Sequence, residues 1–204
     1  MSGIVGSKLN IRGSGLVGSL GTDGQHLLSS GAGVTNVFET AGSGGILQVK
    51  QTVKTDTTTQ AITVGNWYAI SGMTVDITPA ATANKVLVLA DAKIYNTQDL
   101  GVLARIKRDS TAIYVGDAAS LRIRCSGGIG AASGTYGGAN NEIDATFMFL
   151  DDPSSTSAVT YSIDWAGQSG STGYLNRTAV DTDVNYFPRT ASSITVIEVA
   201  SGAL

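Results

Sequence analysis

The sequence predicts an all-β protein, an antiparallel β-sandwich or jelly roll preceded by an extended, glycine-rich N-terminal arm. From Ile46 onward, short runs rich in Val, Ile, Thr and Tyr alternate with turns that contain Gly, Asp, Asn and Pro, which is typical of strands. No stretch combines the apolar spacing of an amphipathic helix with helix caps. About nine short strands separated by turn signals favour a sandwich or a jelly roll.

Residues 1–45 form the predicted arm, and residues 46–204 form the predicted sandwich domain. The arm holds 12 of the 26 glycines, no proline and a single aromatic residue, Phe38. Such a segment has too few large side chains to form a core alone, so we expect it to be ordered only against other chains. The expected apolar anchors are Ile4, Val5, Leu9, Ile11, Leu16, Val17, Leu20, Leu27 and Leu28.

The first part of the domain contains two predicted strands. Residues 46–53 alternate in polarity and form the first strand, whereas the polar residues 55–60 are either a loop or an edge strand. Residues 67–77 form the second, with Gly72 as a bulge or bend. Its apolar side chains are expected on one face: Trp67, Ala69, Met73, Val75 and Ile77.

The middle of the domain has the most apolar run, residues 85–94, which we expect to be a central strand. Residues 101–108 and 112–117 are joined by a short polar loop and are predicted to form a hairpin. Residues 121–125 extend or follow that hairpin. Residues 127–138 contain six glycines and are predicted to be a loop.

The last part of the domain starts with a second predicted hairpin, residues 142–150 and 158–166, joined through 151–155. Residues 173–176 and 193–199 are the closing strands. In the second arm of the hairpin, one face is expected to carry Val159, Tyr161, Ile163 and Trp165, with Trp165 in the core.

Candidate catalytic groups are few. His26 is the only histidine, so a Ser-His-Asp or Cys-His arrangement would need it, and a polar residue of an interface arm is the favoured reading. Cys125 is the only cysteine and is expected to be a buried, small apolar residue. The pair Asp151 and Asp152 precedes Pro153 and is expected to bond turn amides. We therefore expect no catalytic residue and no enzyme.

Cofactors and metals are not expected either, with one weak alternative. Asp181 and Asp183, with Asn176 and Asn185 nearby, could supply oxygen ligands to calcium. Two carboxylates in one loop are a weak signal, so no bound metal is predicted.

The charge pattern argues against nucleic acid and membrane partners. The formal net charge is −3 and the isoelectric point is near 5, whereas nucleic-acid binding favours a basic stripe. Arg105, Lys107 and Arg108 form the densest basic cluster, which is read as a solvated strand face rather than a phosphate site. The longest aliphatic run, 86–90, is too short for membrane insertion.

Aromatic side chains provide the candidates for ligand contact, because sugars stack on exposed rings. Tyr136, in the glycine-rich loop, and Tyr174 are the predicted ligand-facing residues. The other candidates are Trp67, Tyr68, Tyr95, Tyr186 and Phe187.

Several segments resemble one family of virion structural proteins, found in tailed phages of marine bacteria, including cyanophages. Residues 1–18 resemble the start of those proteins, and residues 20–33 resemble a repeat found in many phage tail-fibre proteins. Further segments resemble those proteins in the same order along the chain: 76–79, 108–113, 150–158, 174–177 and 192–196.

This resemblance implies a fibre, spike or head-decoration subunit located in the virion, with a C-terminal sandwich knob similar to tumour-necrosis-factor or complement-type jelly rolls. It also implies a homotrimer whose arm contacts other virion proteins, such as capsid, portal, tail or fibre components. The family brings no catalytic residues. The alternatives are a carbohydrate-binding module that recognises a host-surface glycan and, least favoured, a glycan-degrading enzyme, which would need paired carboxylates in a groove.

Overall fold

The computed structural model describes residues 10–11, 15–16, 25–28, 37–40, 45–96, 101–128, 142–167 and 171–203. The chain divides into two units, Met1–Gly45 and Ile46–Gly202, and each is described by itself.

The N-terminal unit contains two short antiparallel strand pairs. In the first, β1 (Asn10–Ile11) pairs with β2 (Gly15–Leu16). In the second, β3 (Gln25–Leu28) pairs with β4 (Val37–Thr40), and His26 is in register with Glu39. Local strand pairs therefore occur within the segment that was predicted to be an extended arm.

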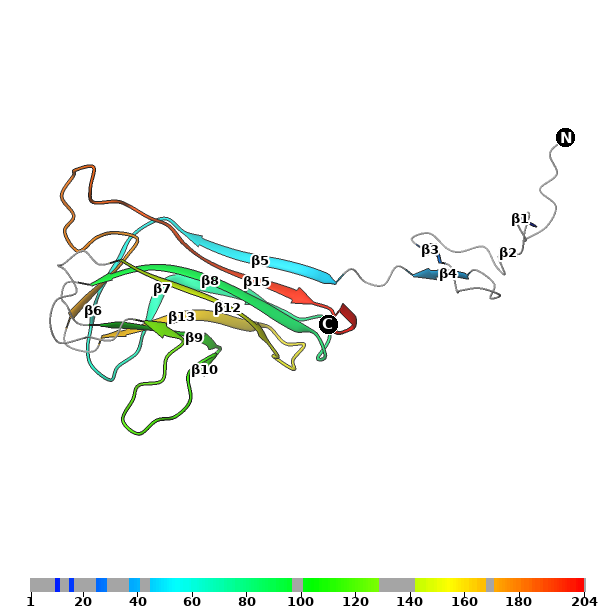
Figure 1. The fold of residues 1–204 in the computed structure, drawn as a ribbon, viewed down its shortest axis with the longest axis horizontal. Coiled ribbons are helices and arrows are strands. Elements are labelled where there is room, and N and C mark those ends of the chain that lie inside the picture. The colour runs from blue at the N-terminus through cyan, green and yellow to red at the C-terminus, as the bar shows by residue number, and fades with distance from the viewer. Residues whose placement is uncertain are drawn as a thin grey trace. The chain divides into compact units, whose positions relative to one another are not determined.

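The second unit is a sandwich of two antiparallel sheets (Figure 1), which confirms the predicted fold class. The first sheet has six strands: β5 (Ile46–Lys54), β6 (Thr58–Ile62), β8 (Lys85–Asn96), β12 (Glu142–Asp151), β14 (Ser171–Leu175) and β15 (Ser192–Val199). Strand β8 is central, as predicted. One of its edges bonds β12, and the other bonds β15 and then β14. Outside these, β5 pairs with β15 and β6 pairs with β14.

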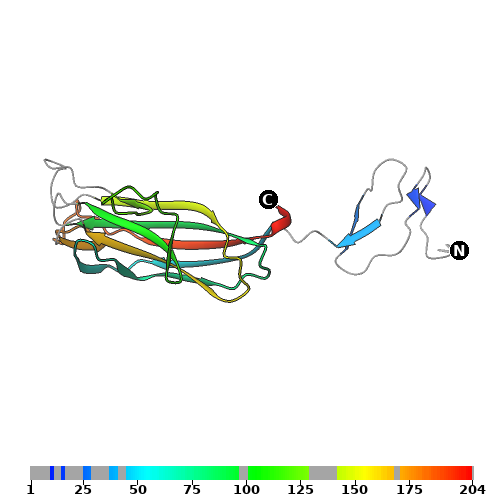
Figure 2. The ribbon, with the colours of Figure 1, turned by 90° about the horizontal axis from the view of Figure 1, so that it is seen from below.

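The second sheet has five strands: β7 (Tyr68–Ile77), β9 (Val102–Arg108), β10 (Thr111–Ile113), β11 (Gly127–Gly128) and β13 (Val159–Gly167). Its order is β10-β9-β13-β7, with β11 beside β10 on the same edge of β9. Strands of both sheets run along the length of the sandwich (Figure 2). A 3-10 turn, η1 (Ser201–Ala203), follows β15.

The core lies between the two sheets, where alternate residues of each strand point inward. Trp165 is fully buried on β13, and the inner face of that strand carries the four residues predicted for it. Burial alternates regularly on β15, where Ile194 and Val196 are buried and their neighbours are half-buried.

The first predicted hairpin is confirmed. Strands β9 and β10 are joined through Asp109 and Ser110, and Asp109 has a positive φ of 53°. Strand β10 is shorter than predicted because it ends at Ile113, and Tyr114 leaves the strand with a φ of 51°. Residues 121–125 do not form the expected strand extension.

The second predicted hairpin is wrong, although both of its strands exist. Strand β12 pairs with β8 in the six-stranded sheet, whereas β13 pairs with β7 and β9 in the other sheet. The connection from Asp152 to Ala158 therefore crosses between the two layers. Packed sheets lie about 10 Å apart, which seven residues span easily.

The predicted bulge at Gly72 is confirmed. Gly72 has a φ of +80°, and the pairing of β7 with β13 shifts register between Ala69 and Thr74. The prediction that one parity faces the core along the whole strand is wrong, because the bulge switches the inward set. Ile70 and Met73 are both buried, whereas Ala69 is exposed.

Candidate interaction surface

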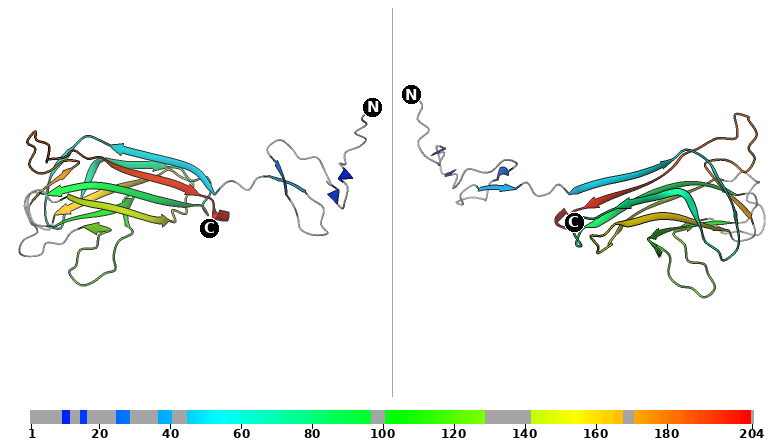
Figure 3. Two further views of the ribbon diagram at one scale, coloured as in Figure 1. Left: turned by 45° about the horizontal axis from the view of Figure 1, so that its top comes forward. Right: turned by 180° about the vertical axis from the view of Figure 1, so that it is seen from behind.

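The outer face of the six-stranded sheet carries a continuous set of aliphatic side chains. Cross-strand pairing places Val49 beside Ile197, Ile197 beside Leu87, and Leu87 beside Leu150. This row thus crosses β5, β15, β8 and β12, which lie side by side in two views of the sandwich (Figure 3). With its neighbours it forms what we call the aliphatic strip: Ile46, Val49, Leu87, Leu89, Met148, Leu150, Ile197 and Val199.

Much of the aliphatic strip is open to solvent. Val49 is 54% exposed, Met148 is 66% exposed and Ile46 is 62% exposed. Scattered apolar residues on a surface are normal, whereas a contiguous apolar area of this kind is a candidate interaction site.

A polar border adjoins the strip on the same face. Gln51 donates a hydrogen bond to Thr195 Oγ1 over 2.8 Å, and Thr146 donates to Asp91 Oδ1 over 3.1 Å. Lys93 pairs with Asp144 at 2.8 Å and with Asp91 at 3.2 Å. The bonds to Asp144 and Asp91 outweigh partial burial and raise the pKa of Lys93. Each of these charged groups therefore has a partner within the face, with one carboxylate in excess of the ammonium.

Strand β5 turns polar side chains toward the core and apolar side chains toward solvent. An ordinary strand of a sandwich does the reverse, because its apolar side faces the core. Its inward positions include Gln48, Thr52 and Lys54, whereas Val49 points outward. Gln48 Nε2 donates to Glu198 Oε2 over 2.5 Å, and Lys54 Nζ lies 2.7 Å from Asp56 Oδ2. The apolar residues of β5 thus gain little burial from their own sandwich.

The outer face of the other sheet is charged, and the basic cluster lies partly on it. Arg105 and Lys107 both pair with the buried Asp164, with N–O distances of 3.0 and 3.3 Å. The Arg105 guanidinium carbon lies 4.3 Å from the centroid of the Trp67 ring. The predicted strand face is therefore confirmed for Arg105 and Lys107, which compensate a buried carboxylate there, and wrong for Arg108, which binds Asp151.

Asp151 links the two sheets. It ends β12 in the six-stranded sheet and accepts hydrogen bonds from Arg108 Nη1, at 2.8 and 3.0 Å, and from Tyr161 Oη at 2.6 Å. Arg108 and Tyr161 belong to the other sheet. Burial, and then the bond to Asp151, raise the pKa of the Tyr161 hydroxyl. Asp151 is thus held in a structural network at the layer crossing.

The turn chemistry predicted for the pair Asp151 and Asp152 is confirmed for Asp152 and wrong for Asp151. Its Oδ1 accepts hydrogen bonds from the Ser154 amide, at 3.2 Å, and from the Ser154 hydroxyl, at 2.8 Å. Its Oδ2 pairs with Lys85, and that bond lowers the pKa of Asp152.

Glu198 is a fully buried carboxylate that sequence reasoning missed. Its Oε1 accepts hydrogen bonds from the Ala80 amide, at 2.7 Å, and from Asn84 Nδ2, at 2.6 Å, while its Oε2 accepts the bond from Gln48. Burial by itself raises its pKa, but these bonds outweigh burial and hold the pKa below its usual value. The regular alternation of β15, continued to this residue, is the signal that would have placed it inward.

The weak calcium candidates are not brought together as a ligand set. Asp181 pairs with Arg177 at 3.1 Å and with Arg189 at 2.6 Å, so its oxygens face cations. Asp183 is exposed. Among the described residues, no cluster of three or more His, Cys, Asp or Glu side chains is suited to hold a metal ion.

Of the two predicted ligand-facing tyrosines, only Tyr174 lies among the described residues. Tyr136 lies outside the described residues. Tyr174 is only 9% exposed, and the guanidinium carbon of Arg177 lies 4.5 Å from its ring centroid. Its ring therefore leaves little surface for stacking against a sugar. Tyr186 is the most exposed of the other aromatic candidates and contacts Phe187.

The predicted anchors fall mainly outside the described residues: Ile4, Val5, Leu9, Val17 and Leu20. Ile11, Leu16, Leu27 and Leu28 lie on the short strands β1, β2 and β3. Their role as anchors stays a prediction. Cys125 is a half-buried free thiol, and burial raises its pKa.

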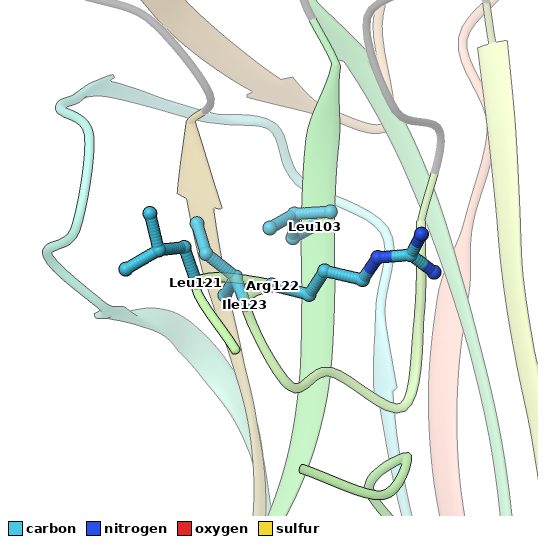
Figure 4. A pocket seen from close by; sticks show the side chains of 4 residues that line it. All are labelled: Leu103, Leu121, Arg122 and Ile123. Atoms are coloured by element: carbon cyan, nitrogen blue, oxygen red, sulfur yellow. The ribbon is translucent and has the colours of Figure 1, made fainter. Parts of the chain in front are cut away.

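One open pocket of about 440 Å³ lies beside the segment between β10 and β11. Leu103, Leu121 and Ile123 gather there, whereas the Arg122 side chain extends away from Leu121 (Figure 4). Leu121 is 98% exposed. These lining residues offer a single ionisable group and no acid–base pair.

Comparison with known proteins assigns no family. No protein-family model matches the chain, and no curated protein matches it. Within the part of the chain that the structure describes, no helix has the length and apolar character needed to cross a bilayer. What the fold defines is an all-β, two-sheet antiparallel sandwich with an apolar outer face.

Proposed function

We propose that this chain is a non-enzymatic structural protein of a phage virion. In this proposal it is a homotrimeric fibre or spike subunit, attached to other virion proteins through residues 1–45. The sandwich projects from the particle and serves attachment to the host surface. The trimer, the arm contact and the virion location follow from the resemblance of the sequence segments to phage structural proteins.

The observation that carries the proposal is the aliphatic strip, because a sheet face with an apolar centre and internally paired charges at its border is suited to permanent coverage by protein. The structural roles of the three buried carboxylates agree with this proposal. Asp151, Asp164 and Glu198 are each held by donors that stabilise the sandwich. Such bonds explain these carboxylates without assigning them any chemistry.

The proposal is tested on purified particles of the phage that encodes the chain. An antibody against the full chain is expected to label intact particles in immunogold electron microscopy, and mass spectrometry of banded particles is expected to recover its peptides. Absence of the chain from particles, with ample protein in the infected-cell lysate, contradicts the proposal.

The alternative role as a glycan-binding module has no comparable support, because the ring of Tyr174 is covered. A glycan array probed with the full chain tests it directly. Specific binding to one glycan class, lost on removal of an exposed aromatic ring, would revive that alternative.

A further inference from the structure

We propose that the aliphatic strip is covered by a second copy of this chain, and that β5 is a strand whose apolar side becomes buried only in that assembly. The inference rests on the proposed function and deepens it, since it names the occupant of the exposed face and the residues that make the contact.

The chemistry of the face argues against an anionic partner. The charged side chains at its border already have partners: Lys93 binds Asp144 and Asp91, and Lys85 binds Asp152. A nucleic acid, an anionic lipid headgroup or an acidic peptide would find no unmatched cation on this border. A second copy offers an apolar surface with the same internally paired border, so neither side has to leave a charge unpaired.

The size of the strip suits the centre of a stable protein contact. Strands lie about 4.8 Å apart and residues on one face lie about 6.8 Å apart along each strand, so each position covers about 33 Å² and the eight positions of the strip cover roughly 260 Å². A standard interface buries about 800 Å² on each partner, with an apolar centre and a polar rim. The strip fits that centre, and the border formed by Gln51, Thr195, Asp91 and Thr146 fits the rim.

The distribution of polar and apolar side chains on the two sides of β5 indicates a contact through the face of the sheet rather than through its edge. Lys50 lies on the inward side of this edge strand and is exposed, and inward-pointing charges on an edge strand oppose the addition of another strand. Ile46 and Val49 point the other way, onto the outer face. Since the inner side of β5 is polar, burial of these two side chains has to come from outside the sandwich.

The test compares single charges placed on the two outer faces of the full chain. Met148→Glu and Val49→Glu place a carboxylate at opposite sides of the strip, and Thr74→Glu places one on an exposed position of β7 in the other sheet. Size-exclusion chromatography with light scattering is run at about 10 µM, a concentration at which a standard interface is assembled. The wild type and Thr74→Glu are expected to show a multiple of 20.8 kDa, and both strip variants are expected to show 20.8 kDa.

A second measurement guards against variants that fail to fold. Val49→Thr keeps the β-branched shape and is expected to weaken self-association tenfold or more while preserving the far-UV circular dichroism spectrum. In the wild type, amide hydrogen exchange in β5 is expected to slow as the protein concentration rises, and exchange in β7 is expected to stay constant.

The outcomes separate this inference from the proposed function. A wild type that runs as a monomer, strip variants that stay assembled, or exchange in β5 that ignores concentration would each overturn the contact proposed here. A monomeric wild type would also overturn the homotrimer of the proposed function, whereas the other two results leave that homotrimer standing. None of these results bears on whether the chain is present in the virion, which the particle experiment decides by itself. Conversely, a chain that assembles through the strip but is absent from particles overturns only the virion assignment.

Discussion

Exchanging Glu198 for glutamine keeps the shape of a fully buried side chain and removes its charge. The wild-type carboxylate accepts from the Ala80 amide and from Asn84 on one oxygen, and from Gln48 on the other. An amide can present only one oxygen, so its NH₂ group must face one of these donors. With the oxygen kept toward Ala80 and Asn84, the amide of Gln48 has to turn over, and its bond to Thr78 O is lost.

The expected cost follows from these contacts. A hydrogen bond to a charged group contributes about 1.5–3 kcal/mol and a neutral one about 0.5–1.5 kcal/mol. Three bonds lose their charge, the bond to Thr78 O disappears, and the smaller desolvation cost of a neutral amide offsets part of this loss, so we expect Glu198→Gln to lower the free energy of unfolding by about 2–4 kcal/mol. Urea denaturation at pH 7, at one fixed protein concentration, measures the loss, since self-association would otherwise shift the midpoint.

The pH dependence has a defined sign. Because the pKa of Glu198 is lower in the folded chain than its usual value, its carboxylate contributes fully above the unfolded pKa. That contribution disappears as the pH falls through the folded pKa. The difference between wild type and Glu198→Gln should therefore be largest at pH 7 and should shrink toward pH 3.

The control is Asp183→Asn, which removes one exposed negative charge and is expected to leave stability unchanged. A Glu198→Gln variant as stable as the wild type at pH 7, or a difference that grows as the pH falls, would refute the reasoning.

Two further predictions concern the crossing between the layers and the edge of the five-stranded sheet. Tyr161→Phe removes the hydrogen bond to Asp151 and is expected to cost about 1–2 kcal/mol in urea unfolding, whereas Tyr186→Phe, at a largely exposed ring, should cost nothing measurable. Gly128→Ala forces a residue with a φ of +148° to carry a Cβ only 2.5 Å from a backbone oxygen of β9; it is expected to cost more than about 2 kcal/mol. Gly116→Ala, which meets nothing within 4 Å, should be nearly neutral. Equal thermal stability of the two alanine variants would contradict the claimed close approach.

Much of the fold was predictable because strands are recognised from local patterns. The inner face of β13 and the alternation of β15 follow from a side-chain period of two, and the central position of β8 follows from its largely apolar sequence. The bulge at Gly72 and the turn held by Asp152 were likewise predictable, since each depends on a few neighbouring residues.

Pairings between distant segments were not predictable from one sequence. Asp164 lies 59 residues from Arg105 in the chain, and Glu198 lies 114 residues from Asn84. No local sequence pattern therefore indicates either contact. The predicted hairpin of residues 142–150 and 158–166 failed for the same reason. The strands were right, but their partners are β8, β7 and β9.

The aliphatic strip depends both on the local sequence of its strands and on the tertiary structure. The sequence by itself determined that residues 46–53 alternate in polarity. Since adjacent side chains of a strand point to opposite sides, this alternation predicts a strand with two different faces. Only the tertiary structure decided that Val49 lies on the outer side, in one row with Ile197, Leu87 and Leu150. The side of a strand that faces the core depends on the sheet packed against it, and that sheet is built from segments far away in the chain.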